Sequence, residues 1–287
     1  MEIAIISGKG GTGKSSLSAA FATLERNVVV ADCDVDAANL YILFDPEVTE
    51  EIVYTAGHKA VLDYDRCTGC NLCADYCRFG AISVNDNGIQ ISENFCDGCF
   101  LCSRVCPVDA ISMIPDNRSR MYSGSFRNGL MVYGRLAPGE ENSGKLVNMV
   151  RSKAKEIAKT SGIGIIIIDG PPGIGCPVIS TITGVNKVVI VTEPTISGLS
   201  DMKRASEIAF RFDRKPYVII NKSDLNPDMT EKIKEWCKKE KITVAGELEF
   251  DPEITEAMLQ RMSITEHNRN TETSMKIKEI WKNIKGN

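Results

Sequence analysis

Short apolar runs alternate with amphipathic stretches along most of this chain. Three runs are rich in isoleucine, valine and alanine: Glu2–Ser7, Val28–Asp32 and Ile163–Ile168. Such a composition is typical of parallel strands that are buried on both faces of a sheet. Further strands are predicted at Lys187–Thr192, Pro216–Asn221 and Thr243–Leu248, and helices at 14–26, Ser200–Phe212 and Asp228–Lys239. This order of elements predicts an α/β fold with a doubly wound, mostly parallel sheet.

The alternation breaks once, in a cysteine-rich and acidic segment between Val61 and Ile114. Its halves repeat each other at a spacing of 29 residues (96 − 67), so that Cys67 recurs as Cys96. Seven acidic residues stand against three arginines there, and their net charge of −4 equals that of the whole chain. We therefore expect a small inserted domain with internal two-fold symmetry, whose acidity suits a basic protein surface as partner.

Charge and hydropathy exclude several classes of function. Outside the insertion acids and bases balance, so the chain lacks the basic stripe that nucleic-acid binding requires. The first ten residues lack the features of a secretory signal, and no apolar run approaches the ~18 residues of a membrane span. We expect a cytoplasmic protein, in which the 11 cysteines are reduced and suited to metal ligation.

A phosphate-binding loop joins the first strand to the first helix. The run Gly8-Lys9-Gly10-Gly11-Thr12-Gly13-Lys14-Ser15 satisfies the pattern G-x-x-x-x-G-K-[ST]. Lys14 is expected to neutralise the β- and γ-phosphates, and the Ser15 hydroxyl to bind Mg²⁺. The expected nucleotide-binding residues of this loop are Gly8, Gly10, Gly11, Thr12, Gly13, Lys14, Ser15 and Ser16.

The stretch Lys9–Ser15 reads K-G-G-T-G-K-S, which resembles the deviant P-loop ATPases of the MinD/ParA/Mrp and nitrogenase iron-protein class. The resemblance implies ATP and ADP as ligands, and an ATP-dependent homodimer in which Lys9 reaches the partner's nucleotide. Asp34 and Asn39 match the switch D-x-D-x-x-x-x-N-L, which implies that Asp34 orients the attacking water. Asp169 matches the aspartate that holds Mg²⁺ through water. Lys9 and Asp34 would then act in catalysis together with Lys14 and Asp169.

The sequence indicates the adenine-binding residues less specifically than the phosphate-binding loop. Asn221 follows another predicted strand, where its amide can read the adenine edge, although a plain loop is the alternative. In related ATPases the stretch Phe250-Asp251-Pro252 lies over the base, which implies Asp251 and Pro252 as contacts. We therefore predict one P-loop ATPase domain in two parts, residues 1–60 and 115–287, around an insertion at 61–114. The pattern of residues 118–145 predicts no definite structure.

The insertion carries two cysteine runs with the spacing of bacterial ferredoxins, C-x₂-C-x₂-C-x₃-C. In such proteins the fourth cysteine of each run ligates the other cluster, so a small α+β ferredoxin-like domain with two [4Fe–4S] clusters is expected. Zinc sites are the alternative. Arg78 occupies the position of the usual proline in the first run. The expected ligands are Cys67, Cys70, Cys73 and Cys106 for the first cluster, and Cys96, Cys99, Cys102 and Cys77 for the second.

Cys176 lies seven residues after Asp169 (176 − 169), the spacing at which the nitrogenase iron protein has one of its cluster cysteines. The resemblance implies a further metal or cluster at Cys176, and an inert thiol is the alternative. Cys33 and Cys237 are expected to be packing residues. The stretch Met275–Ile284 has one apolar helical face, for which docking on the core is favoured over a membrane surface.

These features together predict an ATPase acting in iron–sulfur or mixed-metal cofactor assembly, in which nucleotide gates electron or cluster transfer through the two clusters. One alternative is an ATP-dependent reductase that feeds a low-potential partner enzyme. The other is a spatial organiser similar to MinD or ParA, with clusters as redox sensors. The expected partners are a second copy of the chain, a client metalloprotein or cofactor-assembly protein, and a second ATPase of the same family. No nucleic acid or membrane partner is expected.

Overall fold

The computed structural model of the protein describes residues 1–55, 57–140 and 143–286. The chain forms two compact units. The first comprises 1–51, 121–134 and 144–287, and the second comprises 52–120 and 135–143. The second unit contains the predicted insertion and extends beyond it on both sides.

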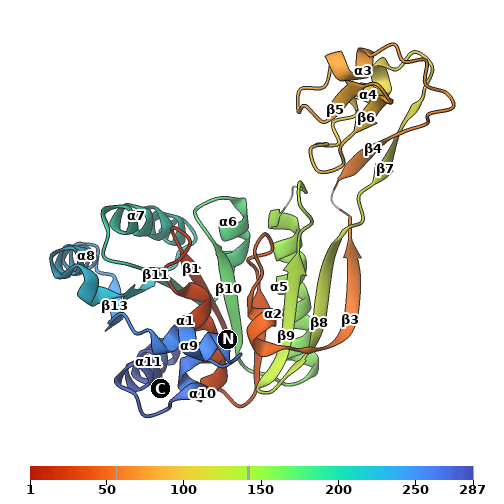
Figure 1. Cartoon of the computed structure of the whole chain (residues 1–287). Coiled ribbons are helices and arrows are strands. Elements are labelled where there is room, and N and C mark those ends of the chain that lie inside the picture. Colours follow the sequence, from red (N-terminus) through yellow and green to blue (C-terminus); the bar gives the residue numbers. More distant parts are fainter. Residues whose placement is uncertain (56, 141–142, 287) are drawn as a thin grey trace. The chain divides into compact units, whose positions relative to one another are not determined.

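A nine-stranded sheet forms the centre of the first unit (Figure 1), in the order β13-β12-β11-β1-β10-β2-β9-β8-β3. The six pairings from β13 to β9 are all parallel, which confirms the mostly parallel sheet. The strands are β1 (Glu2–Ser7), β2 (Val28–Asp32), β3 (Glu47–Tyr54), β8 (Ser119–Phe126), β9 (Gly129–Arg135), β10 (Ile166–Pro172), β11 (Lys187–Thr192), β12 (Tyr217–Asn221) and β13 (Thr243–Leu248).

Helices cover both sides of this sheet, as Figure 1 shows, with α6, α7 and α8 on one side and α1, α10 and α11 on the other. The doubly wound architecture is thereby confirmed. The helices of the first unit are α1 (Lys14–Leu24), α2 (Leu40–Phe44), α5 (Ser143–Thr160), α6 (Cys176–Ile182), α7 (Ile196–Arg211), α8 (Pro227–Lys239), α9 (Glu253–Leu259), α10 (Ile264–His267) and α11 (Glu272–Lys285), with a 3₁₀ turn η1 (Ser223–Leu225).

Strand β10 differs from the prediction in its position along the chain. It begins at Ile166 instead of Ile163 and continues to Pro172. Ile163 instead donates its N–H to the carbonyl of Ala158, closing the end of α5. Asp169 pairs with Ile5 of β1 and with Asp32 of β2, and β1 continues the pairing beyond the aspartate as far as Pro172. Pairing partners distant in the chain therefore decided where this strand begins and ends.

The segment without a predicted structure forms two strands. β8 and β9 are neighbours in the sheet and are joined by Arg127 and Asn128, so they form a hairpin. β9 pairs in parallel with β2, which attaches this hairpin to the core sheet. Its outer strand is followed at the sheet edge by β3.

The C-terminal helix α11 docks on the core as predicted. Ile277, Ile280, Trp281 and Ile284 are at most 4% exposed. The Trp281 ring stacks on Phe21 of α1 at a centroid distance of 4.8 Å. Among the described residues, no helix combines the length and the apolar character that crossing a bilayer requires.

The second unit is built from two copies of a strand–helix–strand pattern. β4 (His58–Leu62), α3 (Leu72–Asp75) and β5 (Ile82–Asn85) form the first copy, and β6 (Gly88–Ile91), α4 (Leu101–Val105) and β7 (Ile111–Pro115) form the second. The strands pair crosswise and antiparallel, β4 with β7 and β5 with β6. Gly69 and Gly98 occupy equivalent positions of the two repeats and both have φ of 69°. The backbone therefore follows the sequence repeat.

Candidate functional site

The glycine loop closes tightly between β1 and α1. Gly11 and Gly13 have φ of 80° and 88°, a region that side chains rarely adopt. A Cβ atom on Gly8 would lie 2.2 Å from the Cβ of Asp201, so this position has no room for a side chain. Gly13 is the N-cap of α1, which turns the first amides of the helix towards the loop. The loop and helix start therefore have the form of an anion-binding site.

Lys14 lies inside this loop among carboxylates. Its side chain is 7% exposed, and its Nζ lies 3.1 Å from Asp169 Oδ1 and 3.8 Å from Asp34 Oδ2. Burial would lower the pKa of Lys14, but the charges of Asp169, Asp34 and Asp32 outweigh it and hold the pKa above its ordinary value. The ammonium is therefore charged and placed where phosphate oxygens would approach the loop.

Asp169 is fully buried and accepts hydrogen bonds from the hydroxyls of two serines of α1. Ser15 Oγ donates to Asp169 Oδ2 at 2.7 Å, and Ser18 Oγ donates to Asp169 Oδ1 at 2.7 Å. Ser15 and Asp169 thus lie together, in the arrangement that hydroxyl and carboxylate ligation of Mg²⁺ requires. Ser18 was not identified from the sequence, although its position three residues after Ser15 places both hydroxyls on the same side of the helix.

Asp32, at the end of β2, is a second buried carboxylate, for which the sequence pattern predicts no role. It accepts the backbone N–H groups of Asp34, Asn39 and Leu40 at 3.1–3.2 Å. Burial, together with the charge of Asp169, raises the pKa of Asp32 to about 7. Asp32 therefore fixes the loop that carries Asp34 and Asn39, and both of these residues line one pocket with the glycine loop.

Lys9 points away from this pocket. Its Nζ lies 2.5 Å from Glu193 Oε1 and within 3.3 Å of the hydroxyls of Thr195 and Ser197. The other oxygen of Glu193 lies 3.4 Å from Nζ of Lys222. Lys9 is thus held by the loop before α7 and by the first turn of α7, and its side chain is 30% exposed, so its action across a dimer stays a prediction.

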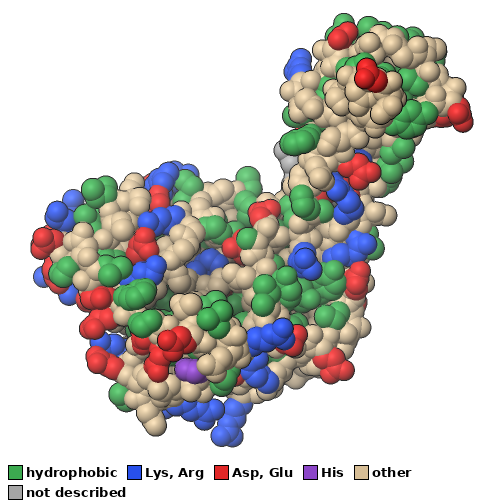
Figure 2. Space-filling model, in the orientation of Figure 1, with side chains coloured by type: hydrophobic (Ala, Val, Ile, Leu, Met, Phe, Trp, Pro, Cys, Tyr) green, Lys and Arg blue, Asp and Glu red, His purple; other side chains and the backbone are tan. Residues whose placement is uncertain are grey.

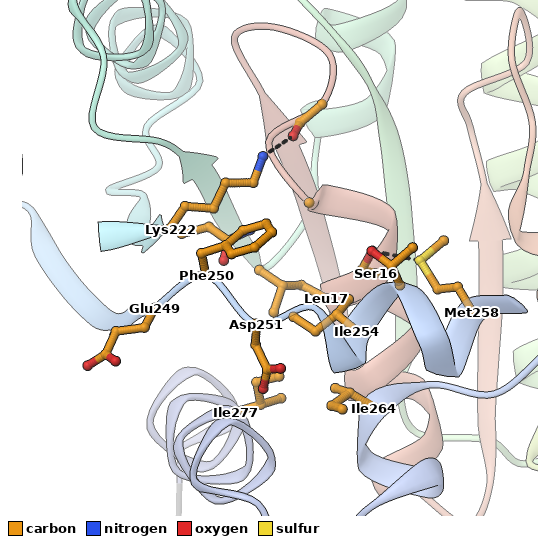
Figure 3. A pocket seen from close by; sticks show the side chains of 14 residues that line it. Ser16, Leu17, Lys222, Glu249, Phe250, Asp251, Ile254, Met258, Ile264 and Ile277 are labelled. Carbon is orange, nitrogen blue, oxygen red and sulfur yellow. Dashed lines mark hydrogen bonds between the residues drawn. The ribbon is translucent and has the colours of Figure 1, made fainter. Parts of the chain in front are cut away.

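A second pocket adjoins the glycine loop on the side of α9. Figure 3 shows its side chains, with Lys222 extended towards the carbonyl of Gly11. Six apolar side chains and six polar or charged ones line this pocket together with two glycines, a mixture that suits a flat heteroaromatic ring. The lining residues are Gly11, Gly13, Ser16, Leu17, Asn221, Lys222, Glu249, Phe250, Asp251, Ile254, Thr255, Met258, Ile264 and Ile277.

The three residues predicted to contact adenine differ in their placement. Asn221 lines the pocket, but its Nδ2 donates to the carbonyl of Thr12 at 2.9 Å and so braces the loop. Asp251 also lines it, with one oxygen accepting the hydroxyl of Thr273 at 2.5 Å. Pro252 is the N-cap of α9 and is not among the lining residues. Met258, which accepts the hydroxyl of Ser16, lines both pockets and was missed.

The three cysteines outside the insertion differ in burial. Cys33 and Cys237 are fully buried, and burial raises the pKa of Cys237 to about 11. Both behave as packing residues, as predicted. Cys176 is exposed at the first position of α6. Its geometry leaves the choice between a metal-handling and an inert thiol untested.

The cysteines of the second unit gather in its small core. Four of them line one pocket together with Ala60, Ile82, Ile91 and Met113. One of the four, Cys77, comes from the first repeat, and the other three, Cys96, Cys99 and Cys102, come from the second. In the first repeat, burial raises the pKa of the Cys73 thiol, and the nearby thiols of Cys67 and Cys70 add to the effect. Cys106 Sγ accepts the N–H of Ala110 at 3.2 Å.

Across the described residues, no three His, Cys, Asp or Glu side chains converge closely enough to hold a single metal ion. A four-iron cluster places its thiolates on four different iron atoms, so its ligands need not converge on one point. A pocket lined by four cysteines and mostly apolar side chains, with Asp97 as an acid among them, has the soft donors and the largely apolar walls that such a cluster requires. The donor set therefore fits an iron–sulfur cluster.

A family model described as the CobQ/CobB/MinD/ParA nucleotide binding domain matches residues 3–264. The chain therefore belongs to this family of nucleotide-binding proteins, whose MinD and ParA members are ATPases. It is 35% identical over 290 residues to an uncharacterized protein of Methanocaldococcus jannaschii, MJ0578, covering 99% of this chain and 96% of that protein.

Solved structures share the fold. The cell division ATPase MinD of Pyrococcus furiosus superposes with a TM-score of 0.59 at 17% identity, covering 99% of this chain and 98% of MinD. The ATP complex of McdA(D38A) from Cyanothece gives 0.61 at 15% identity, covering 100% and 97% of the two chains. At such identities the likeness concerns the fold alone.

Proposed function

We propose that this protein is an ATPase carrying two [4Fe–4S] clusters, which acts in the assembly or transfer of an iron–sulfur or mixed-metal cofactor. In this proposal residues 1–60 and 115–287 form the ATPase domain, and 61–114 form the ferredoxin-like insertion. ATP binding and hydrolysis would make electron or cluster transfer conditional on nucleotide state.

The pocket shared by Cys77, Cys96, Cys99 and Cys102 is the observation that carries this proposal. Crossed ligation requires the fourth cysteine of the first repeat to lie beside the first three of the second. The exchange of strands between the repeats, β4 with β7, supports this arrangement because it binds the two halves into one core. When bound, the clusters would supply one-electron chemistry at low potential.

The nucleotide would bind along the two adjoining pockets of the first unit. Lys14 and the loop amides would hold its phosphates, Ser15 and Asp169 would hold Mg²⁺, and the pocket beside Leu17 would take the base. Asp34 lines the phosphate pocket and is the candidate for orienting the attacking water. Burial raises the pKa of Asp34, which suits a group that must interact with a water proton.

The surface of the second unit suits a protein client. Figure 2 shows hydrophobic side chains over this unit, with Asp and Glu between them. Exposed apolar groups without an internal role mark interaction surfaces, and the acidic residues favour a basic partner. The exposed side chains include Tyr64, Tyr76, Phe79, Val84 and Phe95, which are 46–68% exposed. The client would be a metalloprotein, a cofactor-assembly protein or a second ATPase of the same family.

The experiment that tests the proposal is metal analysis of protein purified without oxygen. We expect about eight irons and eight acid-labile sulfides per chain, from two four-iron clusters. Cys77→Ser should damage the cluster held by Cys96, Cys99 and Cys102 and leave the other one intact, as read by electron paramagnetic resonance. Protein that contains zinc and no iron would refute the proposal.

Cys176 separates cofactor transfer from the reductase alternative. Its exposed thiol stands at the start of α6, directly after the turn that follows β10 and Asp169. If Cys176 handles metal, Cys176→Ala should keep iron content and ATP hydrolysis but lose delivery to a client. Full delivery by this variant would favour the reductase, with its stable clusters and ATP-dependent electron transfer.

A second candidate function is favoured by the fold. MinD and McdA match nearly the whole chain in structure, so a spatial organiser with redox-sensing clusters is a coherent alternative. Such a protein would redistribute in the cell as ATP is hydrolysed. Fluorescence microscopy of a tagged chain tests this, because the carrier and the reductase should both be diffuse.

A further inference from the structure

A lysine is buried beside the backbone of one expected cluster ligand. Lys59 of β4 is 6% exposed. Its Nζ donates to the carbonyl oxygen of Cys96 at 2.6 Å and to that of Gly139 at 3.2 Å. Burying an ammonium group is costly unless it is paired and hydrogen-bonded, so a lysine kept in this position calls for an explanation.

The anions near Lys59 compensate its charge incompletely. Asp116 Oδ2 lies 3.6 Å from Lys59 Nζ, but the guanidinium of Arg118 donates hydrogen bonds of 2.7–3.2 Å to the same carboxylate. The hydrogen bonds from Arg118 hold the pKa of Asp116 well below its usual range. One carboxylate is thus shared between two cations, which leaves an excess positive charge in this group.

Two further acids belong to this cluster: Glu93, which acts on Arg118 and is exposed to solvent, and Glu140. Both carboxyl oxygens of Glu140 are buried and accept no hydrogen bond from any described residue. Burial, followed by the neighbouring Asp116, raises the pKa of Glu140 to about 7. Below neutral pH Glu140 is therefore protonated, and the excess positive charge of Lys59, Asp116 and Arg118 persists.

The first repeat lacks this arrangement. Cys67 is the counterpart of Cys96, and the N–H of each donates to a carbonyl four residues earlier at 3.1 Å. Among the side chains that the structure describes, none donates to the carbonyl of Cys67. Arg66, which directly precedes Cys67, is exposed and donates to the carbonyl of Val108. The two halves are therefore alike in backbone and different in local charge. The pocket of the second repeat also has Asp97 in its lining, where the first repeat has Thr68, but Asp97 is exposed. Solvent and salt screen an exposed acid more than the buried Lys59, so the cation prevails.

We propose that Lys59 makes the two clusters unequal, so that the cluster held by Cys77, Cys96, Cys99 and Cys102 has the higher reduction potential. The inference rests on the proposed function, because it requires both clusters. Reduction adds one electron and breaks no bond, and the added negative charge is stabilised by a fixed cation in a dry environment. The first electron given to this unit therefore settles on the second cluster, and Lys59 is a positioning residue for that charge.

The test is a redox titration of the anaerobic protein at pH 6, with dithionite as reductant and electron paramagnetic resonance as readout. The parent should show two separate one-electron steps. Lys59→Gln keeps a hydrogen-bond donor but removes the charge. In this variant the reduced-to-oxidised ratio of the second cluster, measured at the parental midpoint potential, should fall at least tenfold. This corresponds to a midpoint potential lower by about 59 mV. The first cluster should be unchanged, and Lys59→Arg should restore most of the separation. Cys99→Ser identifies which signal belongs to the second cluster.

The possible failures are distinguishable. Parent protein without iron would end the proposed function and this inference together. Full iron content with both potentials unmoved in Lys59→Gln would overturn the inference alone. If Lys59→Gln does not fold, Asp116→Asn provides the opposite test. Removal of this anion should raise the potential of the second cluster, and an unchanged or lower value would overturn the inference.

Discussion

At the scale of single residues, the nucleotide site is a balance of buried charges. Lys14 stands against Asp169 and Asp34, while Asp32 lies behind them with its oxygens on backbone amides. Asp169 and Asp34 set two negative charges against one ammonium, and Asp32, whose pKa is raised to about 7, adds to this excess when it ionises. Mg²⁺ would relieve that excess when nucleotide binds, since it adds positive charge next to Asp169.

Lys14→Ala tests the phosphate contact. Removing the only cation that the described part of the chain places beside Asp169 should weaken ATP binding at least tenfold, about 1.4 kcal/mol. Isothermal titration with ATP and Mg²⁺ measures the change. The exposed Lys239→Ala serves as a control and should bind as the parent does. Unchanged affinity in Lys14→Ala would contradict the assignment of this loop.

The raised pKa of Asp32 predicts how stability depends on pH. The folded chain holds a proton on Asp32 up to about pH 7, whereas the unfolded chain releases it near the ordinary value of 3.8. The folded state thus binds more protons in between, and the free energy of unfolding should fall as pH rises from about 4 to 7.

Asp32→Asn removes this titration. Its free energy of unfolding, from urea denaturation between pH 4 and 7, should decline less steeply than that of the parent. The difference in slope is at most about 1.4 kcal/mol per pH unit, the value for one proton. Glu140, whose pKa is also raised, acts in the same sense in both proteins. Parallel curves for the two proteins would show that Asp32 titrates normally.

At the scale of elements, α11 holds the ATPase core together from the C-terminal end. Trp281 is 4% exposed, stacks on Phe21 and donates its indole N–H to Glu25 at 2.7 Å. The same carboxylate accepts from Lys285 at 2.7 Å. The helix is thereby fixed to α1, which also carries Lys14 and Ser15.

Trp281→Ala should therefore destabilise the protein strongly. The loss of a buried aromatic side chain typically costs about 3–5 kcal/mol. Urea denaturation followed by circular dichroism measures it. Met275→Ala, at a position of the same helix that is 57% exposed, should change the free energy of unfolding by less than about 0.5 kcal/mol. Equal effects of the two substitutions would mean that α11 does not pack as described.

At the scale of the whole molecule, the prediction concerns Lys9 and a second copy of the chain. In the single chain Lys9 is held by Glu193, Thr195 and Ser197, outside its own phosphate pocket. If it serves the partner subunit's ATP, Lys9→Ala should still bind ADP but should lose ATP-dependent dimerisation and turnover. Sedimentation with ATP and with ADP measures both states. Ser197→Ala is a matched control, and an intact ATP dimer of Lys9→Ala would remove the argument for action in trans.

The sequence by itself determined the features whose evidence is local. A glycine loop ending in Lys14 and Ser15 predicts a helix start and a phosphate site, because the contacts that shape it lie within a few residues. The alternation of strands and helices predicted the doubly wound sheet for a similar reason. The repeat of Cys67 as Cys96 predicted two equivalent halves, and the backbone of the second unit follows it.

Tertiary structure alone decided the features that join distant parts of the chain. Strand β10 runs beyond its isoleucines because β1 and β2 pair with it, and the hairpin of β8 and β9 finds its place beside β2. Ser18 meets Asp169 across 151 residues, and Lys59 meets Cys96 across 37. No local pattern specifies such pairs, because a buried polar group finds whichever partner the packed elements bring to it.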